Sequence, residues 1–308
     1  MSKKYSIGTG IVAVLLICTV LLSGCGSGGG EKKSKSSETE KTPVKDNTQA
    51  VQDVKQAEKI FQALPSPLES AMLIKSAGGR FDRNYLNPVE NQNKYTTNNS
   101  QALNLGIYTC DLSFASLYDQ TQLIINYMNA AKKMANGLGI MDAIQQSTID
   151  RLEENINNTQ VILDIVSETF LNSNSYLSDN DQPAIATTVL VGGWIEGLYI
   201  ATQLVDLKEF NGNKLVGRII DQKLSIQILL DLLEKNKEVP NIQGLVTQMS
   251  KLKAVFDKIN INAKPIRTEI DKSTNTTILR SEVTTDMSQA TFKELKDVTS
   301  EIRNSFVQ

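Results

Sequence analysis

The chain has 308 residues, of which 40% are apolar and 21% are charged, and its formal net charge is −2. This balance is typical of a globular protein with its own core, and it lacks the concentrated basic charge of a nucleic-acid-binding protein. The sequence contains no histidine. That excludes Ser-His-Asp and Cys-His catalysis, zinc sites of the H-E-x-x-H type and haem held by histidine.

The first 25 residues have the three-part pattern of a secretion signal. Lys3 and Lys4 give a positive start, residues 11–22 are apolar apart from Thr19, and Leu22-Ser23-Gly24-Cys25 ends the stretch. A membrane-spanning helix needs about 20 apolar residues, so this stretch is better suited to a cleaved signal than to a permanent anchor. An uncleaved membrane anchor is the alternative.

The segment Leu22–Cys25 resembles the lipobox of bacterial lipoproteins. The resemblance implies that residues 1–24 are removed and that Cys25 becomes a lipidated amino terminus, carrying palmitate-type acyl chains. Two or more such chains anchor a protein stably to a membrane. The next residue, Gly26, does not resemble the retention signal of the inner membrane. We therefore expect an exported protein held at the outer membrane.

Residues 25–48 are nearly free of apolar side chains and rich in Gly, Ser, Lys and Glu. Such a segment buries too little apolar area to offset its ordering entropy, so we expect a disordered tether with a reach of roughly 25 Å. Cys18 lies in the signal, which leaves Cys110 as the one unlipidated cysteine of the mature chain. An internal disulfide is therefore excluded, and we expect Cys110 to be a small buried residue.

The fold class that the pattern predicts is mainly α, a multi-helix bundle built from helical hairpins over residues 49–263. Ser66, Pro67 and Glu69 form a capping box with proline in the first turn, which marks one helix start. Residues 80–99 are polar and are expected to form a long loop. The expected helical stretches are 51–64, 66–77, 100–117, 123–136, 142–170, 184–205, 215–233 and 242–259.

Residues 184–205 are long and apolar enough to suit a membrane span, and Glu196 is their one charged residue. Because a carboxylate near the centre of a membrane helix is costly, we expect a helix at the core of the bundle. A membrane helix is the alternative. Gly192, Gly193 and Gly197 are expected to let a neighbouring helix approach closely.

After residue 263 the pattern becomes β-prone. Residues 266–270 and 277–283 predict a hairpin around the polar turn 271–276, and Ser288 is expected to start a final helix. Because an isolated hairpin is marginally stable, we expect residues 264–308 to pack on the helical domain.

Glu196 is the main candidate for a functional residue, because a carboxylate in an apolar helix needs a partner or a proton. One interpretation is a polar pocket, and the alternative is a buried network that fixes helix packing. The candidate pocket residues are Glu196, Trp194, Tyr199, Asp111, Tyr108 and Arg80.

The sequence predicts no cofactor and no metal site. Asp179 and Asp181 suggest a calcium loop, but the glycine and the distant glutamate of that motif are missing, so we interpret them as helix-capping residues.

Two segments, Ala102–Tyr108 followed by Asp111 and Gly192–Tyr199, are similar to helical lipoproteins of the Bacteroidota type. The similarity extends over about residues 68–205. It implies a helical lipoprotein but no activity, because the activity of that group is uncharacterised.

The resulting hypothesis is a non-catalytic, membrane-anchored lipoprotein that acts as a binding or interaction module in the cell envelope. Its expected partners are the membrane, through the lipid anchor, and a protein or small molecule of unknown identity, but no nucleic acid. The alternatives are an envelope enzyme that uses carboxylates and tyrosines around Glu196, and a structural component of the envelope.

Overall fold

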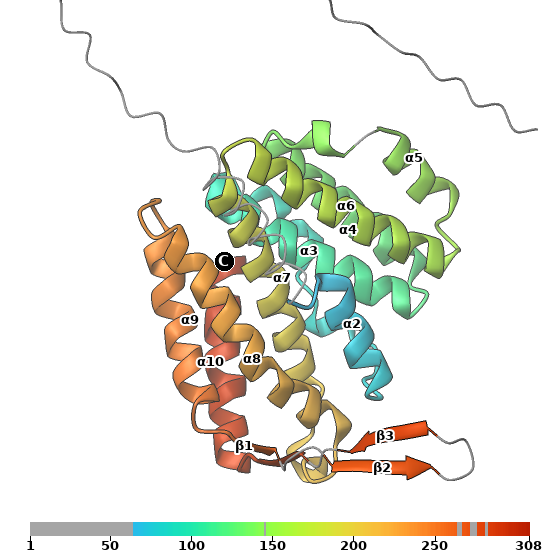
Figure 1. Cartoon of the computed structure of the whole chain (residues 1–308). Helices are drawn as coiled ribbons and strands as arrows, with labels where there is room; N and C mark the ends of the chain where they lie inside the picture. The colour runs from blue at the N-terminus through green and yellow to red at the C-terminus, as the bar shows by residue number, and fades with distance from the viewer. Residues whose placement is uncertain (1–63, 145, 264–266, 272–275, 281–282) are drawn as a thin grey trace, which may run out of the picture. The chain divides into compact units, whose positions relative to one another are not determined.

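The computed structural model describes residues 64–144, 146–263, 267–271, 276–280 and 283–308, and these residues form a mainly helical fold (Figure 1). The predicted signal, tether and first apolar stripe, up to residue 63, lie outside the described residues. The α-helices are α2 (Pro67–Ser76), α3 (Asn98–Leu117), α4 (Thr121–Gly137), α5 (Gln146–Glu154), α6 (Thr159–Asp179), α7 (Pro183–Gln203), α8 (Lys214–Lys235), α9 (Ile242–Phe256) and α10 (Gln289–Val307). Four 3₁₀ turns lie in the described connections: η1 (Arg83–Tyr85), η2 (Val89–Asn93), η3 (Met141–Ala143) and η4 (Leu207–Glu209).

Helix α7 lies at the centre of this arrangement and packs against α2, α3, α6, α8 and α10. Among the described helices it is the one long and apolar enough to cross a membrane. However, 89% of its most apolar window is buried against the rest of the protein. A helix that is apolar on all sides must be covered on all sides, so α7 has the place predicted for a core helix.

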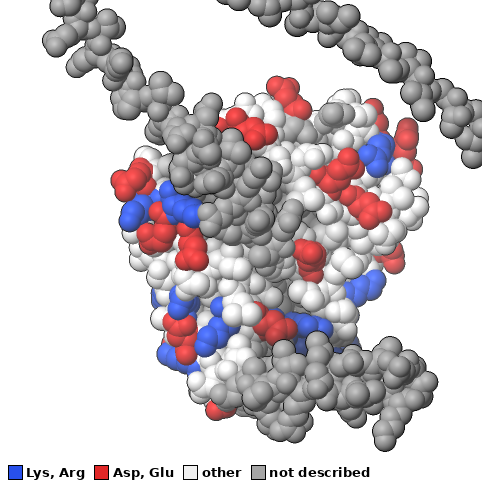
Figure 2. Space-filling view, in the orientation of Figure 1, with Lys and Arg blue, Asp and Glu red and all other residues white. Residues whose placement is uncertain are grey.

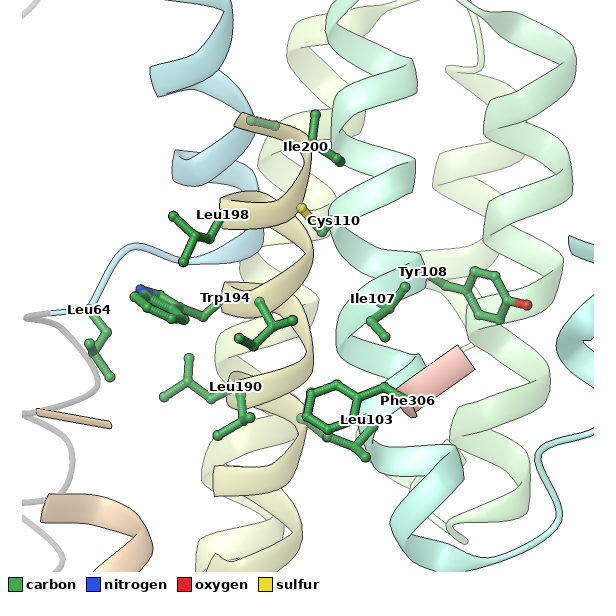
Figure 3. Close-up of a cluster of buried hydrophobic side chains, with 14 of the residues drawn as sticks. Leu64, Leu103, Ile107, Tyr108, Cys110, Leu190, Trp194, Leu198, Ile200 and Phe306 are labelled. Atoms are coloured by element: carbon green, nitrogen blue, oxygen red, sulfur yellow. The ribbon is translucent and has the colours of Figure 1, made fainter. Parts of the chain in front are cut away.

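The core lies on both sides of α7 (Figure 3). Leu190, Trp194 and Leu198 face the side of Leu64, whereas the opposite side of α7 faces Cys110 and its neighbours on α3. Cys110 is a buried free thiol, as the sequence predicts. Removing these large apolar surfaces from water supplies the main stabilisation of the bundle.

Glycines bring α3 and α7 into direct backbone contact. A Cβ added to Gly106 would overlap the carbonyl oxygen of Val189, and one added to Gly192 would overlap that of Leu103. The prediction that glycines of α7 permit a close approach is therefore confirmed.

The expected signals for helix ends are present at several positions. The Ser66 Oγ accepts from the Glu69 N–H at 3.2 Å, and the Ser66 N–H donates to the Glu69 carboxylate at 2.7 Å, which confirms the capping box. Helix α3 begins two residues before the predicted Ser100, because the Thr97 side chain caps it and accepts from the Ser100 N–H. Asp119, with φ of 55°, lies in the turn between α3 and α4, in the gap between the predicted helical stretches 100–117 and 123–136.

The single helix predicted over residues 142–170 is wrong. Asp142 lies within η3, α5 is short, and α6 starts after Asn158, whose side chain accepts from the Val161 N–H. The expected break in helix after residue 170 is also wrong, because α6 continues to Asp179. Buried residues that include Leu177 extend its inner face, and this tertiary packing outweighs the low helix propensity of the Asn and Ser residues.

Asp179 and Asp181 do not cap the following helix. Helix α7 begins after Gln182 without any side-chain cap, and Asp181 instead adopts a left-handed backbone conformation with φ of 57°.

The predicted hairpin is confirmed, and a second strand pair extends it. Strands β2 (Arg267–Asp271) and β3 (Thr276–Arg280) pair antiparallel, as do β1 (Asn260–Ala263) and β4 (Val283–Asp286). In Figure 1, β2 and β3 extend away from the helices. The final helix α10 starts after the capping residue Ser288, as predicted, and packs on α7 and α9.

The substitution Gly106→Ala tests the backbone contact between α3 and α7. We expect it to lower the free energy of unfolding by about 1–3 kcal/mol or more, because the added methyl must separate the two helices. Denaturant unfolding measures the change. Gly217→Ala on α8 is the matched control: a Cβ there meets no neighbouring atom, so the variant should be as stable as wild type or more so. Equal effects of both substitutions would contradict the close approach.

Candidate functional site

A buried ion pair connects α7 to α10. The Arg303 Nε donates to Glu196 Oε2, and its Nη2 donates to Oε1, both at 2.9 Å. Glu196 is 0% and Arg303 is 6% exposed. The guanidinium also lies 4.6 Å from the centre of the Tyr199 ring, so its face is covered by an aromatic side chain. This bidentate arrangement is the strongest form of carboxylate–guanidinium pairing, and it engages both oxygens of Glu196.

A second buried carboxyl group, Asp111 on α3, lies beside this pair. Its Oδ2 accepts from the Asn87 N–H at 3.0 Å, while Oδ1 has no hydrogen-bond donor among the described residues. Burial and the neighbouring Glu196 carboxylate raise the pKa of Asp111 well above its ordinary value, although Arg303 opposes the shift. Burial and the nearby carboxylate therefore favour the protonated form of Asp111 beside the ion pair.

The charge of Arg303 is stabilised by the same carboxyl groups. Burial alone would lower the pKa of its guanidinium, but the contact with Glu196 and the proximity of Asp111 raise the pKa above the ordinary value. Arg303 therefore stays charged, and one ionised carboxylate is enough to neutralise it.

A polar network joins the loop before α3 to the end of α10. The Asn87 side-chain amide donates to Asn104 Oδ1 at 3.1 Å, and the Asn104 amide donates to the Phe306 carbonyl at 2.9 Å. The Tyr95 hydroxyl donates to the Val307 carbonyl at 3.2 Å. These bonds satisfy carbonyl groups in the last turn of α10, which have no partner within the helix.

Three tyrosines pack beside Asp111. The ring centres of Tyr95 and Tyr108 are 6.2 Å apart, and those of Tyr108 and Tyr127 are 6.0 Å apart. Burial raises the pKa of all three phenols, so they remain neutral at physiological pH. The Tyr108 hydroxyl donates to the Pro88 carbonyl at 3.2 Å.

The structure brings together only some of the candidate residues. Glu196, Asp111 and Tyr199 meet at Arg303, and Tyr108 lies next to Asp111. Trp194 lies on the other side of α7, where its Nε1 donates to Gln222 at 3.0 Å. Arg80 is exposed and lines a separate groove.

The partner that sequence analysis missed is Arg303, along with the supporting residues Asn87, Tyr95 and Asn104. One signal for Arg303 was present. The apolar stripe of α10 runs through Phe292, Leu295, Ile302 and Phe306, and Arg303 belongs to the same face. A charged residue on a buried face needs a buried partner of opposite charge.

The groove lined by Arg80 is large and open. It has a volume of about 1240 Å³ and lies between the connection after α2, the connection from α7 to α8, and Lys296 on α10. Three cationic side chains, Arg80, Lys214 and Lys296, line it, and none of them forms an ion pair with another described residue.

Three acidic residues, Asp82, Asp206 and Glu209, also line the groove, and two of them accept a hydrogen bond from the backbone. Asp82 accepts from the Asn84 N–H, and Asp206 accepts from the Lys208 N–H, both at 2.9 Å. Partial burial lowers the pKa of Lys296, while Asp297 and Asp206 oppose the shift. The groove therefore carries three cationic and three acidic side chains, and its cations form no ion pair among the described residues.

No family model, curated protein or solved structure matches this chain. Among the described residues, no group of three or more His, Cys, Asp or Glu side chains is placed to hold a metal ion. The function is therefore inferred from the geometry of the buried pair and the groove.

Removing the cation of the buried pair should be severely destabilising. We expect Arg303→Met to lower the free energy of unfolding by about 3–5 kcal/mol, because it leaves a buried charge without its partner. The double variant Glu196→Gln with Arg303→Met should recover part of that loss. Denaturant unfolding of all three variants measures the coupling.

The matched control is the exposed pair of Lys251 and Glu301, whose charged atoms are 2.6 Å apart. Lys251→Met should change stability by less than about 1 kcal/mol. A loss of that size for Arg303→Met would contradict a buried, mutually dependent pair.

The proton on Asp111 predicts a pH dependence of stability. Its pKa is raised in the folded state, so this group stabilises the fold below its unfolded pKa of about 3.9, and that contribution is lost as the pH rises toward the folded pKa. Between these two pKa values, one proton changes the free energy of unfolding by at most about 1.4 kcal/mol per pH unit.

Asp111→Asn should remove this slope, because an amide does not titrate. We therefore expect the variant to be more stable than wild type at neutral pH, by an amount that shrinks as the pH falls. Unfolding measured from pH 4 to 8 gives the comparison. Parallel curves for wild type and variant would show that Asp111 binds no extra proton in the folded state.

Proposed function

We propose that the chain is a lipid-anchored, non-catalytic binding module of a bacterial cell envelope. The anchor is supported by the order of the positive start, the apolar stretch and the lipobox-like Leu22–Cys25 in the sequence. The binding role is supported mainly by the groove of about 1240 Å³ in which Arg80, Lys214 and Lys296 have no ion-pair partner among the described residues.

The groove carries charged side chains of both signs, so it favours a partner with charged groups of its own. An acidic side chain or another anionic group could pair with the three cations without displacing an existing ion pair of the described residues. Elsewhere the surface is mixed: in Figure 2, acidic and basic side chains lie next to one another on the visible face. Charge complementarity of this kind contributes more to the specificity and rate of association than to affinity.

The enzymatic alternative has less support. Glu196 is completely buried, and both of its oxygens accept hydrogen bonds from Arg303. A general acid or base must reach the proton it transfers, within hydrogen-bond distance or through one water. The arrangement around Glu196 suits the fixing of helix packing better than the handling of a substrate.

The anchor is tested by labelling cells with a palmitate analogue and measuring the mass of the mature amino terminus. We expect a lipidated Cys25 without residues 1–24, and we expect Cys25→Ser to abolish the label and release the protein from membranes. An unmodified thiol on a chain that retains residues 1–24 would contradict the anchor.

Binding is tested by pull-down from native membranes with the lipidated protein. The variants are Arg80→Ala with Lys214→Ala in the groove, and Lys251→Ala outside it as the control. We expect the groove variant to lose bound material that wild type and the control retain, and the loss to grow smaller at high salt. If wild type, the groove variant and the control recover equal amounts of bound material, the groove is not the binding site.

A further inference from the structure

A second cavity lies on the other side of the bundle, separate from the groove. It has a volume of about 80 Å³ and is enclosed by α3, α4, α5, α6 and α7. Its wall is mainly apolar, with residues such as Leu105, Met128, Leu152 and Val166. The exposed side chain of Lys132 also lines it, so the cavity reaches the surface.

One polar group in this cavity has no partner. The Asn174 side chain lines the cavity and is 6% exposed, and its Nδ2 makes no hydrogen bond with any residue that the structure describes. A buried donor without an acceptor costs free energy, so such groups are rare in native proteins. An acceptor supplied by a bound molecule would remove that cost.

Two neighbouring threonine hydroxyls already donate to carbonyl groups. The Thr109 hydroxyl donates to the Leu105 carbonyl, and the Thr169 hydroxyl donates to the Ile165 carbonyl, both at 2.7 Å. Both hydroxyls therefore use their protons within their own helices. Among the described residues that line the cavity, the Asn174 amide is the buried side-chain donor without a partner.

The size and chemistry of the cavity restrict what can enter. Its volume is roughly half that of an engineered cavity of about 150 Å³ that stays dry and binds benzene. Because the cavity reaches the surface beside Lys132, a slender alkyl chain can enter it with one end outside, so a chain suits this space better than a ring system. Lys132 at the surface favours a neutral or anionic molecule over a cation.

We propose that this cavity binds a short linear alkyl chain carrying one oxygen acceptor, of the alcohol or fatty-acid class, with the oxygen accepting from Asn174 Nδ2. This site is independent of the lipid anchor and of the groove, so its failure would leave the proposed function unaffected.

Isothermal titration calorimetry of the full chain with 1-hexanol, hexanoate and hexylammonium tests the proposal. We expect 1-hexanol and hexanoate to bind. Hexylammonium should bind at least about fivefold more weakly, because it cannot accept from Asn174. The chemical-shift change of the Met128 methyl resonance during titration should give the same order of affinities for the three probes. Absence of 1-hexanol binding, or equal binding of all three probes, would overturn the assignment.

Two variants and one control separate a binding role from a structural one. Asn174→Leu should bind 1-hexanol about fivefold more weakly while its melting temperature stays equal or rises, because the unpaired donor is gone. Ala131→Phe, in the cavity wall, should abolish binding by filling the space. Asn172→Leu, exposed on the same helix, should bind as wild type does. Unchanged affinity in Asn174→Leu would show that the amide does not hold the ligand.

Discussion

The architecture depends on the charge buried at the centre of the bundle. Glu196 is the one charged residue of α7, and burying it without compensation would cost more than any single apolar contact returns. Arg303 supplies the opposite charge from α10, 107 residues further along the chain. The structure therefore requires its last helix to dock against its central one. Replacing such a pair by apolar residues is often tolerated, whereas breaking it is not, so the pair restricts which helix can occupy that place.

The surrounding polar groups extend the same constraint to α3 and to the loop before it. Asp111 contributes a second buried carboxyl group beside Glu196, and Asn87 and Asn104 link that loop to the last turn of α10. Glycine contacts between α3 and α7 hold the backbones close enough for these side chains to meet. Glu196 and its neighbours, which the sequence suggested as a possible catalytic site, thus hold the helices together. We propose that binding takes place elsewhere, in the charged groove and in the apolar cavity.

Local signals predicted the parts of the fold that neighbouring residues determine. The capping box at Ser66, the central position of the apolar helix around Glu196 and the start of the last helix after Ser288 could all be predicted from short segments. The continuation of α6 to Asp179 could not, because its propensity is poor and its burial against other helices stabilises it. The sequence also showed that Glu196 needs a partner. It could not identify Arg303, because pairing between distant helices depends on the tertiary arrangement. The same limit applies to Arg80, which the sequence grouped with Glu196 and the fold places in the groove.

The central claim is that the buried pair makes α10 an integral part of the bundle. Hydrogen–deuterium exchange of the wild type and of Arg303→Met tests it most directly, because exchange reports local opening element by element. The account predicts that amides of α10 exchange as slowly as those of α7 in the wild type and become the first helical amides to exchange in the variant. Fast exchange of α10 in the wild type, with α7 still protected, would contradict it.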